Sequence, residues 1–409
     1  MRVLWFSVTP SLFNPHTNTH NGGGWISSLE KILHGEKSIE LGVAFKFLNA
    51  EFKYHKNCVS YYPIPYYRPG LMDKLFNRDK QNEFIKHCLR IIDDFHPDLI
   101  QIFGSENEFG ILTQYTDIPI IIHMQGCLPP YHNALFPVGM NIYDFFFARK
   151  LTWHYRLMGI RSEPSFRKRA QKEIETVQHC NYFMGRTEWD KNLVHLFHPE
   201  AKYFHCEEAL RDSFLQLNQK WEWKTSTKVN IISVISNPWY KGVDLILKTA
   251  QLLKKKTHLN FEWSVYGVQD IGFYESKYGI KASEVGVTVM GSAQQEELVE
   301  ALCQSSCYVH PSYIDNSPNS LCEAQYLGVP VLATFVGGIP SLVKDGVTGK
   351  LFPANDPYTL VGLIQQITTD QMLACSLSIK ERKAAAIRHN PQTIRQSLLN
   401  VYHQILKNE

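Results

Sequence analysis

Two carboxylates flank a polar turn in the second half of the sequence. Asp315 and Glu323 are separated by seven residues; an apolar run at residues 307–310 precedes them, and helical spacing follows from about residue 319. A helix that begins just after a strand offers unpaired backbone amides and the positive end of its dipole, which suit a phosphate group. We therefore predict an anion site formed by the turn and the first helical residues, Asn316, Ser317, Asn319, Ser320 and Leu321.

A structural role for the two acids is the alternative. Carboxylates near a helix start often only complement the helix dipole or cap a turn. Asp315 and Glu323 fit either role when they are considered without the surrounding sequence.

Lys241 comes after an expected strand at residues 231–235 and just before an expected helix at 243–255. This position lets its ammonium reach the same strand-end edge, where it would act as a point charge for phosphate. A solvated surface lysine is the alternative.

Three glycines follow the first expected strand. Gly22, Gly23 and Gly24 precede an amphipathic helix, and without Cβ atoms their amides can closely approach a phosphate or sugar. A flexible turn is the alternative, because no G-x-G-x-x-G motif occurs.

Three more polar residues follow strand-like runs of the first half: Glu106, His123 and Arg186. We expect all three to face a cleft, with Glu106 and Arg186 on the acceptor side. Arg186 could equally contact phosphate or form a structural ion pair, and His123 could simply be hydrogen-bonded in place.

Short apolar runs alternate with helical patterns through both halves of the chain, which predicts two parallel sheets covered by helices. A length of 409 residues also favours two domains. We expect a first domain at 1–205, a linker at 206–228 and a second domain at 229–391, with a terminal helix at about 392–409 that needs a docking surface. Residues 126–164 are expected to be irregular.

Composition excludes several function classes. The net charge of +3 does not favour nucleic acid as a partner, and nine scattered cysteines without a C-x-x-C pair argue against disulfides or structural zinc. The first apolar run is more typical of a buried strand than of a signal segment, and no stretch is long enough to span a membrane. We expect a cytoplasmic protein, and the sequence does not indicate how many subunits it forms.

A basic stretch interleaved with aromatic and apolar residues covers 149–172. Such a pattern suits peripheral contact with an anionic membrane on its inner face, although a solvated helix face is the alternative.

The second half resembles the retaining family-4 glycosyltransferases, also called glycosyl transferases group 1. The similarity rests on the acid-x7-acid spacing, on Gly328-Val329-Pro330-Val331, on the Gly337-Gly338-Ile339-Pro340-Ser341 turn and on Asp345-Gly346-Val347-Thr348-Gly349. Two departures stand out. Asp315 occupies a position where the family usually has Glu, and Ser236 one where it commonly has Arg.

This resemblance implies an α/β GT-B fold, in which two Rossmann-like doubly wound domains face each other across a cleft and the C-terminal helix returns to the first domain. It also implies the roles of the donor-site residues. Glu323 would bind the donor ribose, the Asn319, Ser320 and Leu321 amides and Lys241 would hold the diphosphate, the glycine loop would approach the donor, and Asp315 and His123 would face the transferred sugar.

The expected activity is transfer of a hexose-type sugar from a nucleotide-diphosphate sugar to a hydroxyl of a glycan or lipid-linked glycan, with retention of configuration, in surface polysaccharide biosynthesis. The nucleotide sugar is a co-substrate, and no cofactor is expected. No metal is expected either, since the sequence lacks Asp-x-Asp. His123, Asp315 and Lys241 would be the catalytic residues, with no protein nucleophile. The alternatives are a degenerate sugar-nucleotide-binding subunit and a GT-B epimerase or phosphorylase.

Overall fold

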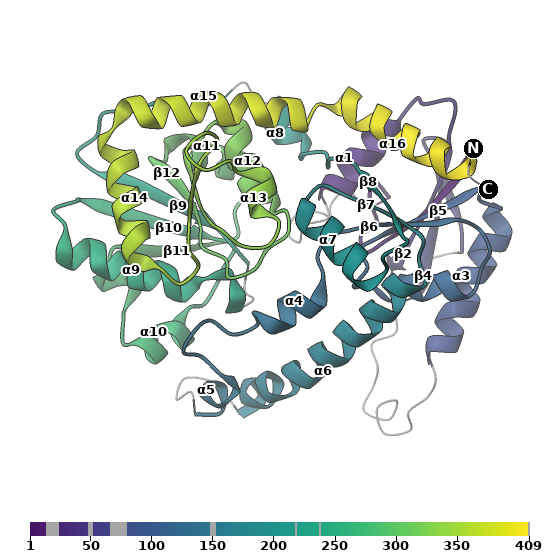
Figure 1. The fold of residues 1–409 in the computed structure, drawn as a ribbon, viewed down its shortest axis with the longest axis horizontal. Helices are drawn as coiled ribbons and strands as arrows, with labels where there is room; N and C mark the ends of the chain where they lie inside the picture. The colour runs from purple at the N-terminus through teal and green to yellow at the C-terminus, as the bar shows by residue number, and fades with distance from the viewer. Residues whose placement is uncertain are drawn as a thin grey trace.

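A computed structural model describes residues 1–13, 24–47, 52–65, 80–147, 153–216, 219–236 and 239–407. Two sheets organise the chain (Figure 1). The first has eight strands in the order β3-β4-β2-β1-β5-β6-β7-β8, and its pairs are parallel except for β3 with β4. Its strands are β1 Arg2–Ser7, β2 Glu40–Phe47, β3 Tyr54–Lys56, β4 Val59–Pro65, β5 Leu99–Phe103, β6 Ile120–His123, β7 Tyr182–Gly185 and β8 Lys202–His205.

The second sheet has six parallel strands in the order β11-β10-β9-β12-β13-β14. Central strands such as β12 are buried along their whole length, as expected for a parallel sheet covered on both faces. The strands are β9 Val229–Val234, β10 Phe261–Tyr266, β11 Val287–Gly291, β12 Cys307–His310, β13 Val331–Thr334 and β14 Lys350–Phe352.

Helices cover both sheets. Those of the first half are α1 Gly24–Leu33, α3 Lys80–Phe95, η2 Glu108–Gln114, α4 Leu128–Asn133, α5 Ile142–Phe147, α6 Trp153–Gln178, α7 Glu188–Phe197 and α8 Asp212–Gln216. Those of the second half are η3 Trp239–Lys241, α9 Val243–Lys256, α10 Gly272–Tyr278, η4 Ala282–Glu284, α11 Gln295–Gln304, α12 Asn319–Leu327, α13 Ile339–Leu342, α14 Pro357–Thr369, α15 Gln371–Arg388 and α16 Pro391–Lys407.

The C-terminal helix α16 returns to the first domain. Figure 1 shows α15 running along the second domain and α16 continuing beside α1, close to both ends of the chain. Ile394, Leu398 and Tyr402 of α16 are buried in one core with β1 and α1 residues such as Trp5 and Trp25. This confirms the expected α/β architecture, including the helix that crosses back.

Within 126–164, the residues that the structure describes are largely helical, so the prediction of an irregular stretch is wrong. Pro129 and Pro130 lie in the first turn of α4, where a missing amide is tolerated, and Pro164 lies inside α6. These prolines and the surrounding aromatic residues obscure the helical periodicity. The segment reaches across to the second domain, where Met140 joins the hydrophobic core and Asp144 pairs with Lys277 at 2.5 Å.

The segment between the two sheets packs against the second domain. Trp221 is buried, its amide donates to the Leu327 carbonyl at 2.9 Å, and its indole donates to the Ser305 carbonyl at 2.7 Å. The domain boundaries proposed from the sequence stay a prediction.

Candidate functional site

Each sheet reverses its strand order next to its first strand, at β1 and β5 in the first domain and at β9 and β12 in the second. Ligands of open α/β sheets bind outside the carboxyl ends of the strands at such a point. The loop after β9 carries Lys241, and the loop after β12 carries Asp315. The predicted donor-site residues of the second domain therefore meet at one edge of its sheet.

Asp315 is the centre of this edge, because one of its oxygens is shared by three groups. Oδ2 lies 2.6 Å from Lys241 Nζ, 2.9 Å from His310 Nε2 and 3.2 Å from Ser312 Oγ. The side chains of Asp315 and Lys241 are only 8% and 15% exposed. Burial alone would raise the pKa of Asp315, but the ammonium of Lys241 and the hydrogen bond from His310 outweigh burial and lower it.

Two glycine contacts fix the loops around Asp315. Gly242 adopts φ +82°, and a Cβ there would lie 2.1 Å from the Pro311 carbonyl oxygen, so only glycine lets the Lys241 loop approach the loop after β12. Gly337 has φ +52°, and a Cβ at this position would lie 2.0 Å from the Asp315 carbonyl oxygen. The glycines of the downstream motif thus pack directly on the Asp315 turn.

Glu323 is the middle residue of α12 and is buried, and Arg211 binds it in a bidentate pair. Arg211 Nε and Nη2 donate to its two carboxylate oxygens at 2.6 and 2.7 Å. Burial raises the pKa of Glu323, and the Arg211 guanidinium opposes that shift. A Cβ on Gly24 would stand 3.0 Å from the Arg211 side chain. Gly24, the one residue of the predicted glycine loop that the structure describes, therefore lies against the arginine that binds Glu323.

The start of α12 is partly open to an anion. The Leu321 amide donates to the Pro318 carbonyl at 3.1 Å, whereas the amides of Asn319 and Ser320 have no acceptor within the part of the chain that the structure describes. Arg186 reaches this helix start from the first domain. It donates to the carbonyl oxygen of Ser317 and, at 3.1 Å, to the Asn319 side chain.

Arg186 is itself buried and pairs with Glu208 at 2.9 Å. Arg186 therefore lies between the two domains, at the start of α12. This position favours contact with an anion at the helix start over the predicted contact with the acceptor. Burial raises the pKa of Glu208 to about 7, although Arg186 opposes the shift.

Asn316 joins the two domains at this edge. The side chain of Asn316 accepts from Thr187 Oγ1 at 2.7 Å and donates to Asp190 Oδ2 at 3.2 Å. Its backbone N–H donates to Tyr131 Oη at 3.0 Å. Tyr131 in turn donates to Asp315 Oδ1 at 3.4 Å. The first domain thus supplies a hydroxyl to the central carboxylate.

His123 ends β6 and is fully buried. Its ring stacks on Phe103 at 5.9 Å between centroids and meets the edge of Trp25 at 5.1 Å. Burial and the neighbouring Arg186 lower the pKa of His123 to about 3, so the imidazole is neutral at physiological pH. Its Nε2 atom lies 3.8 Å from Glu208, beyond hydrogen-bond distance.

Glu106 lines a cavity of about 690 Å³ between α3, η2 and α6, at the carboxyl end of β5. Glu173 lies in the same wall and accepts from the Leu128 amide at 2.6 Å and from the Ser105 hydroxyl. Burial raises the pKa of Glu106 to about 7 and that of Glu173 to about 8. Arg169 and Lys172 add positive charge to a lining whose other polar groups are carboxyl, amide and hydroxyl groups, and Phe84 and Ile111 add apolar surface.

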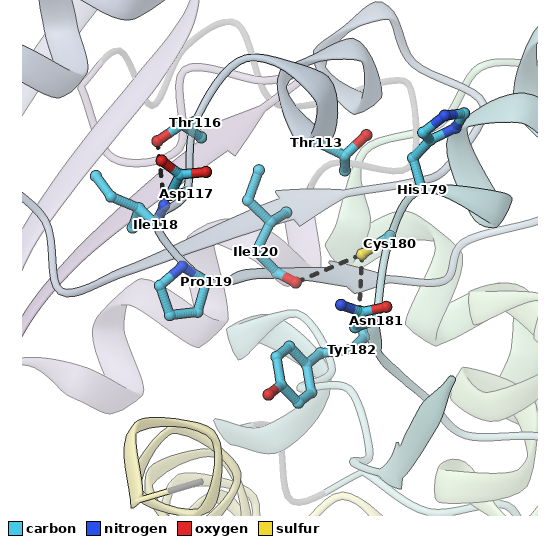
Figure 2. Close-up of a pocket in the computed structure, with 10 residues that line it drawn as sticks. All are labelled: Thr113, Thr116, Asp117, Ile118, Pro119, Ile120, His179, Cys180, Asn181 and Tyr182. Carbon is cyan, nitrogen blue, oxygen red and sulfur yellow. Dashed lines mark hydrogen bonds between the residues drawn. The ribbon is translucent and has the colours of Figure 1, made fainter. Parts of the chain in front are cut away.

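A smaller hollow of about 200 Å³ lies at the opposite edge of the first sheet (Figure 2). Its lining includes Pro119 and Ile120 at the start of β6 and Asn181 and Tyr182 at the start of β7. The Cys180 thiol there donates to the Ile120 carbonyl at 3.4 Å. Because this hollow faces the amino ends of the strands, it is remote from the site described above.

The structure brings together most of the predicted site residues that it describes: Gly24, His123, Arg186, Lys241, Asp315, Asn316, Ser317, Asn319, Ser320, Leu321 and Glu323. Glu106 belongs to the separate cavity. Gly22 and Gly23 lie outside the described residues, as do residues 149–152 of the basic stretch.

Sequence reasoning missed four polar partners of the site: Tyr131, Glu208, Arg211 and His310. His310 had a signal, since it ends a strand five residues before Asp315. Arg211 and Glu208 fall in the segment predicted to be a linker, and Tyr131 falls in the segment predicted to be irregular.

Metal ligands do not gather in the part of the chain that the structure describes. Among those residues, no group of three or more His, Cys, Asp or Glu side chains is arranged to hold a metal ion. Within the same described ranges, no helix has both the length and the apolar character needed to cross a bilayer.

Comparison with known proteins gives a family match in the second half of the chain. Residues 216–385 match the family model described as glycosyl transferases group 1. D-inositol 3-phosphate glycosyltransferase of Streptomyces avermitilis is 36% identical over 95 residues, which are 23% of this chain and 19% of the relative. Amylovoran biosynthesis glycosyltransferase AmsK of Erwinia amylovora is 26% identical over 148 residues, 34% of this chain and 36% of the relative. The matches thus span only about a fifth to a third of these relatives.

Solved structures match over the whole chain. Sucrose-phosphate synthase from Thermosynechococcus elongatus superimposes with a TM-score of 0.72 at 16% identity and covers 100% of both chains. HepE of Anabaena, solved in complex with UDP-glucose, has a TM-score of 0.66 at 12% identity and covers 99% of this chain and 100% of its own. These similarities establish the fold, which is GT-B.

Proposed function

We propose that this chain is a nucleotide-sugar-dependent glycosyltransferase that transfers a hexose-type sugar to a hydroxyl group with retention of configuration. The observation that carries the proposal is the convergence of Lys241, Asp315, Glu323 and the open start of α12 on one strand-end edge of a GT-B domain. The match of residues 216–385 to glycosyl transferases group 1 supports it.

The donor diphosphate would lie at the start of α12. The amides of Asn319 and Ser320 have no acceptor among the described residues, and Lys241 has two N–H groups besides the one that Asp315 takes. Arg186 would supply a second cation, which the exposed Ser236 cannot. We assign the donor ribose to Glu323, whose carboxylate keeps acceptor capacity beside its two bonds to Arg211.

Transfer would break the bond between the anomeric carbon and the diphosphate oxygen, and the electron pair would leave with the diphosphate. The acceptor oxygen would bond to the anomeric carbon on the same face, and its proton would pass to the departing phosphate. Lys241, Arg186 and the helix amides would stabilise the developing charge without a metal. His123 would donate from its neutral ring to a donor-sugar hydroxyl, and Asp315 would face the same sugar.

The acceptor would be a glycan or lipid-linked glycan. The cavity lined by Glu106 offers the carboxyl, amide and hydroxyl groups that bind sugar hydroxyls. A role in surface polysaccharide synthesis is supported by the similarity to a relative named for amylovoran biosynthesis. Arg167 and Lys168 are exposed on α6, which leaves them accessible to an anionic membrane at the cytoplasmic face.

Thermal stabilisation by nucleotide sugars tests the donor site, since a ligand that binds the folded state raises Tm. UDP-, GDP- and ADP-glucose would be compared without added metal, and each variant would be referred to its own ligand-free Tm. We expect one nucleotide to stabilise the wild type and Glu323→Gln to lose the shift. Glu300→Gln removes the same charge from an exposed position of α11 and should keep it. An equal shift in Glu323→Gln would refute the ribose assignment.

Activity is the second arm of this test. Release of the nucleoside diphosphate that depends on added glycan acceptor would support transfer. Tight donor binding without such release on any acceptor pool would contradict the proposed transfer and favour a sugar-nucleotide-binding subunit.

A further inference from the structure

A buried row of hydrogen bonds connects the C-terminal helix to the ring of His123. Trp5 of β1, Gln101 of β5, His123 of β6 and Tyr402 of α16 are all 0% exposed. Trp5 Nε1 donates to Tyr402 Oη at 3.1 Å, Tyr402 Oη donates to Gln101 Oε1, and Gln101 Nε2 lies 3.5 Å from His123 Nδ1. Residues nearly 400 positions apart in the sequence thus share one network.

The indole fixes the direction of the first bond in this row, and the single hydrogen of the buried Tyr402 hydroxyl then sets the direction of the others. An indole nitrogen can only donate, so Tyr402 must accept from Trp5. The single hydroxyl hydrogen of Tyr402 is then available for Gln101 Oε1, which turns the amide nitrogen of Gln101 toward His123. Since that nitrogen can only donate, His123 Nδ1 must accept, and the proton of the neutral ring is on Nε2.

The opposite arrangement leaves a buried group without a partner. Rotating the Gln101 amide would turn its oxygen toward His123 Nδ1 and its NH2 group toward Tyr402. Tyr402 could then accept from both neighbours, but its own hydrogen would have no acceptor among the described residues around it. Buried hydroxyl groups without a partner are unfavourable, so the network selects one tautomer.

The protonated nitrogen of His123 has no partner of its own. Nε2 is buried, no hydrogen bond is formed to it within the described residues, and the nearest carboxylate, that of Glu208, is 3.8 Å away. A buried N–H in this condition calls for an acceptor that arrives with a ligand. The stacking of the ring between Phe103 and Trp25 keeps the N–H aimed in one direction.

We propose that Trp5, Tyr402 and Gln101 are positioning residues that hold His123 as the Nε2–H tautomer, ready to donate to a hydroxyl of the bound sugar. The identity of that acceptor rests on the proposed function, whereas the tautomer does not. The return of α16 to the first domain therefore has a chemical consequence besides packing.

Nitrogen NMR of ¹⁵N-histidine-labelled protein tests the tautomer directly in the absence of ligand. The chain has 17 histidines, and the resonances of His123 are those missing from His123→Gln. We expect a bare Nδ1 and a protonated Nε2 in the wild type. Tyr402→Phe should shift population toward the Nδ1–H form. A wild-type proton on Nδ1, or an unchanged tautomer in Tyr402→Phe, would overturn the relay.

Tyr62→Phe is the matched control for this variant. It also removes a buried hydroxyl from the first domain, one that binds Asp94 on the other face of the sheet, and should leave the His123 signals unchanged. Should Tyr402→Phe fail to fold, Gln101→Glu keeps the side-chain length but replaces the donating NH2 group next to His123 with an oxygen that accepts, and a proton on Nδ1 is then expected.

Affinities for UDP-glucose and UDP separate the relay from the proposed function. If a sugar hydroxyl accepts a hydrogen bond from His123 Nε2–H, Tyr402→Phe should weaken UDP-glucose binding about 2- to 10-fold, which corresponds to the loss of one neutral hydrogen bond. Binding of UDP, which lacks the sugar, should be unchanged. Equal weakening of both ligands would overturn the sugar contact. A wild type that binds neither ligand would count against the proposed function for this nucleotide, while the NMR result still decides the relay.

Discussion

The carboxylate of Asp315 has to share one oxygen among Lys241, His310 and Ser312, and this sharing keeps the Lys241 ammonium in place before any ligand arrives. A lysine held at 2.6 Å from a buried acid loses little conformational freedom when a phosphate binds. The pair thus presents a preorganised cation whose charge is only partly neutralised.

Replacing Lys241 with methionine should weaken binding of the donor by about 1–3 kcal/mol, the range for one charge-assisted hydrogen bond. The variant should also be less stable, because Asp315 loses the cation that lowers its pKa. Isothermal titration with the nucleotide sugar and thermal unfolding measure the two effects. Lys255→Met, at an exposed position of α9, is the control and should change neither.

The double variant Lys241→Met, Asp315→Asn separates these two roles. Removing both charges should restore much of the lost stability, since no unpaired buried charge remains, but it should not restore donor affinity. A loss seen only in the acceptor KM would show that Lys241 does not contact the donor.

At the scale of elements, the site depends on how closely the loop after β9 approaches the loop after β12. Gly242 begins α9 in the left-handed region at φ +82° and touches the Pro311 carbonyl. This contact sets the position of Lys241 relative to Asp315, because Lys241 directly precedes Gly242 and Asp315 follows Pro311 in the loop after β12.

Gly242→Ala should therefore lower both stability and donor affinity. Gly279→Ala is a matched control, since Gly279 has φ +64° but open space where a Cβ would stand. The left-handed conformation alone should cost about 1–2 kcal/mol in either variant. Chemical denaturation should show at least twice that loss for Gly242→Ala, and equal losses would mean that the loops can separate freely.

Sequence patterns predicted the elements better than the partners of the site residues. Buried strands such as β5 and β12 stand out as continuous apolar runs, and the strand-end rule then places Lys241 and Asp315 at one edge. The pairing of Glu323 with Arg211 has no local signal, because the two residues are 112 positions apart and meet only through the packing of the connecting segment. Proline-rich α4 was missed for a different reason, since its periodicity spans only six residues.

At the scale of the whole molecule, the two domains meet through buried groups that titrate. His389 follows α15 and binds the Glu208 carbonyl at 2.8 Å, and His123 and Arg186 approach the Glu208 side chain from the first domain. Burial is the largest cause that lowers the pKa of His389 and of His123, each to about 3, and that raises the pKa of Glu208 to about 7. The pH dependence of the free energy of unfolding is thus a sum of opposing contributions from groups at one interface.

The histidine contribution has a definite sign. With a folded pKa of about 3 and an ordinary value of 6.5, His389 binds its proton more readily in the unfolded chain. Its contribution to stability is therefore complete above pH 6.5 and is lost as pH falls toward 3, by about 1.4 kcal/mol per pH unit. Glu208 acts oppositely, since its raised pKa costs stability as pH rises from about 4.5 through 7.

Because these contributions oppose each other, a difference between variants is more informative than the wild-type curve. The stability of His389→Gln relative to wild type should rise by about 1 kcal/mol as pH falls from 6.5 to 5.5, since glutamine does not titrate. Calorimetric unfolding across that range measures the difference. His258→Gln, which replaces an exposed histidine just after α9, is measured in parallel as the control for the substitution. A constant difference for His389→Gln would mean that the histidine takes up its proton equally in the folded and the unfolded protein, and hence that burial does not lower its pKa.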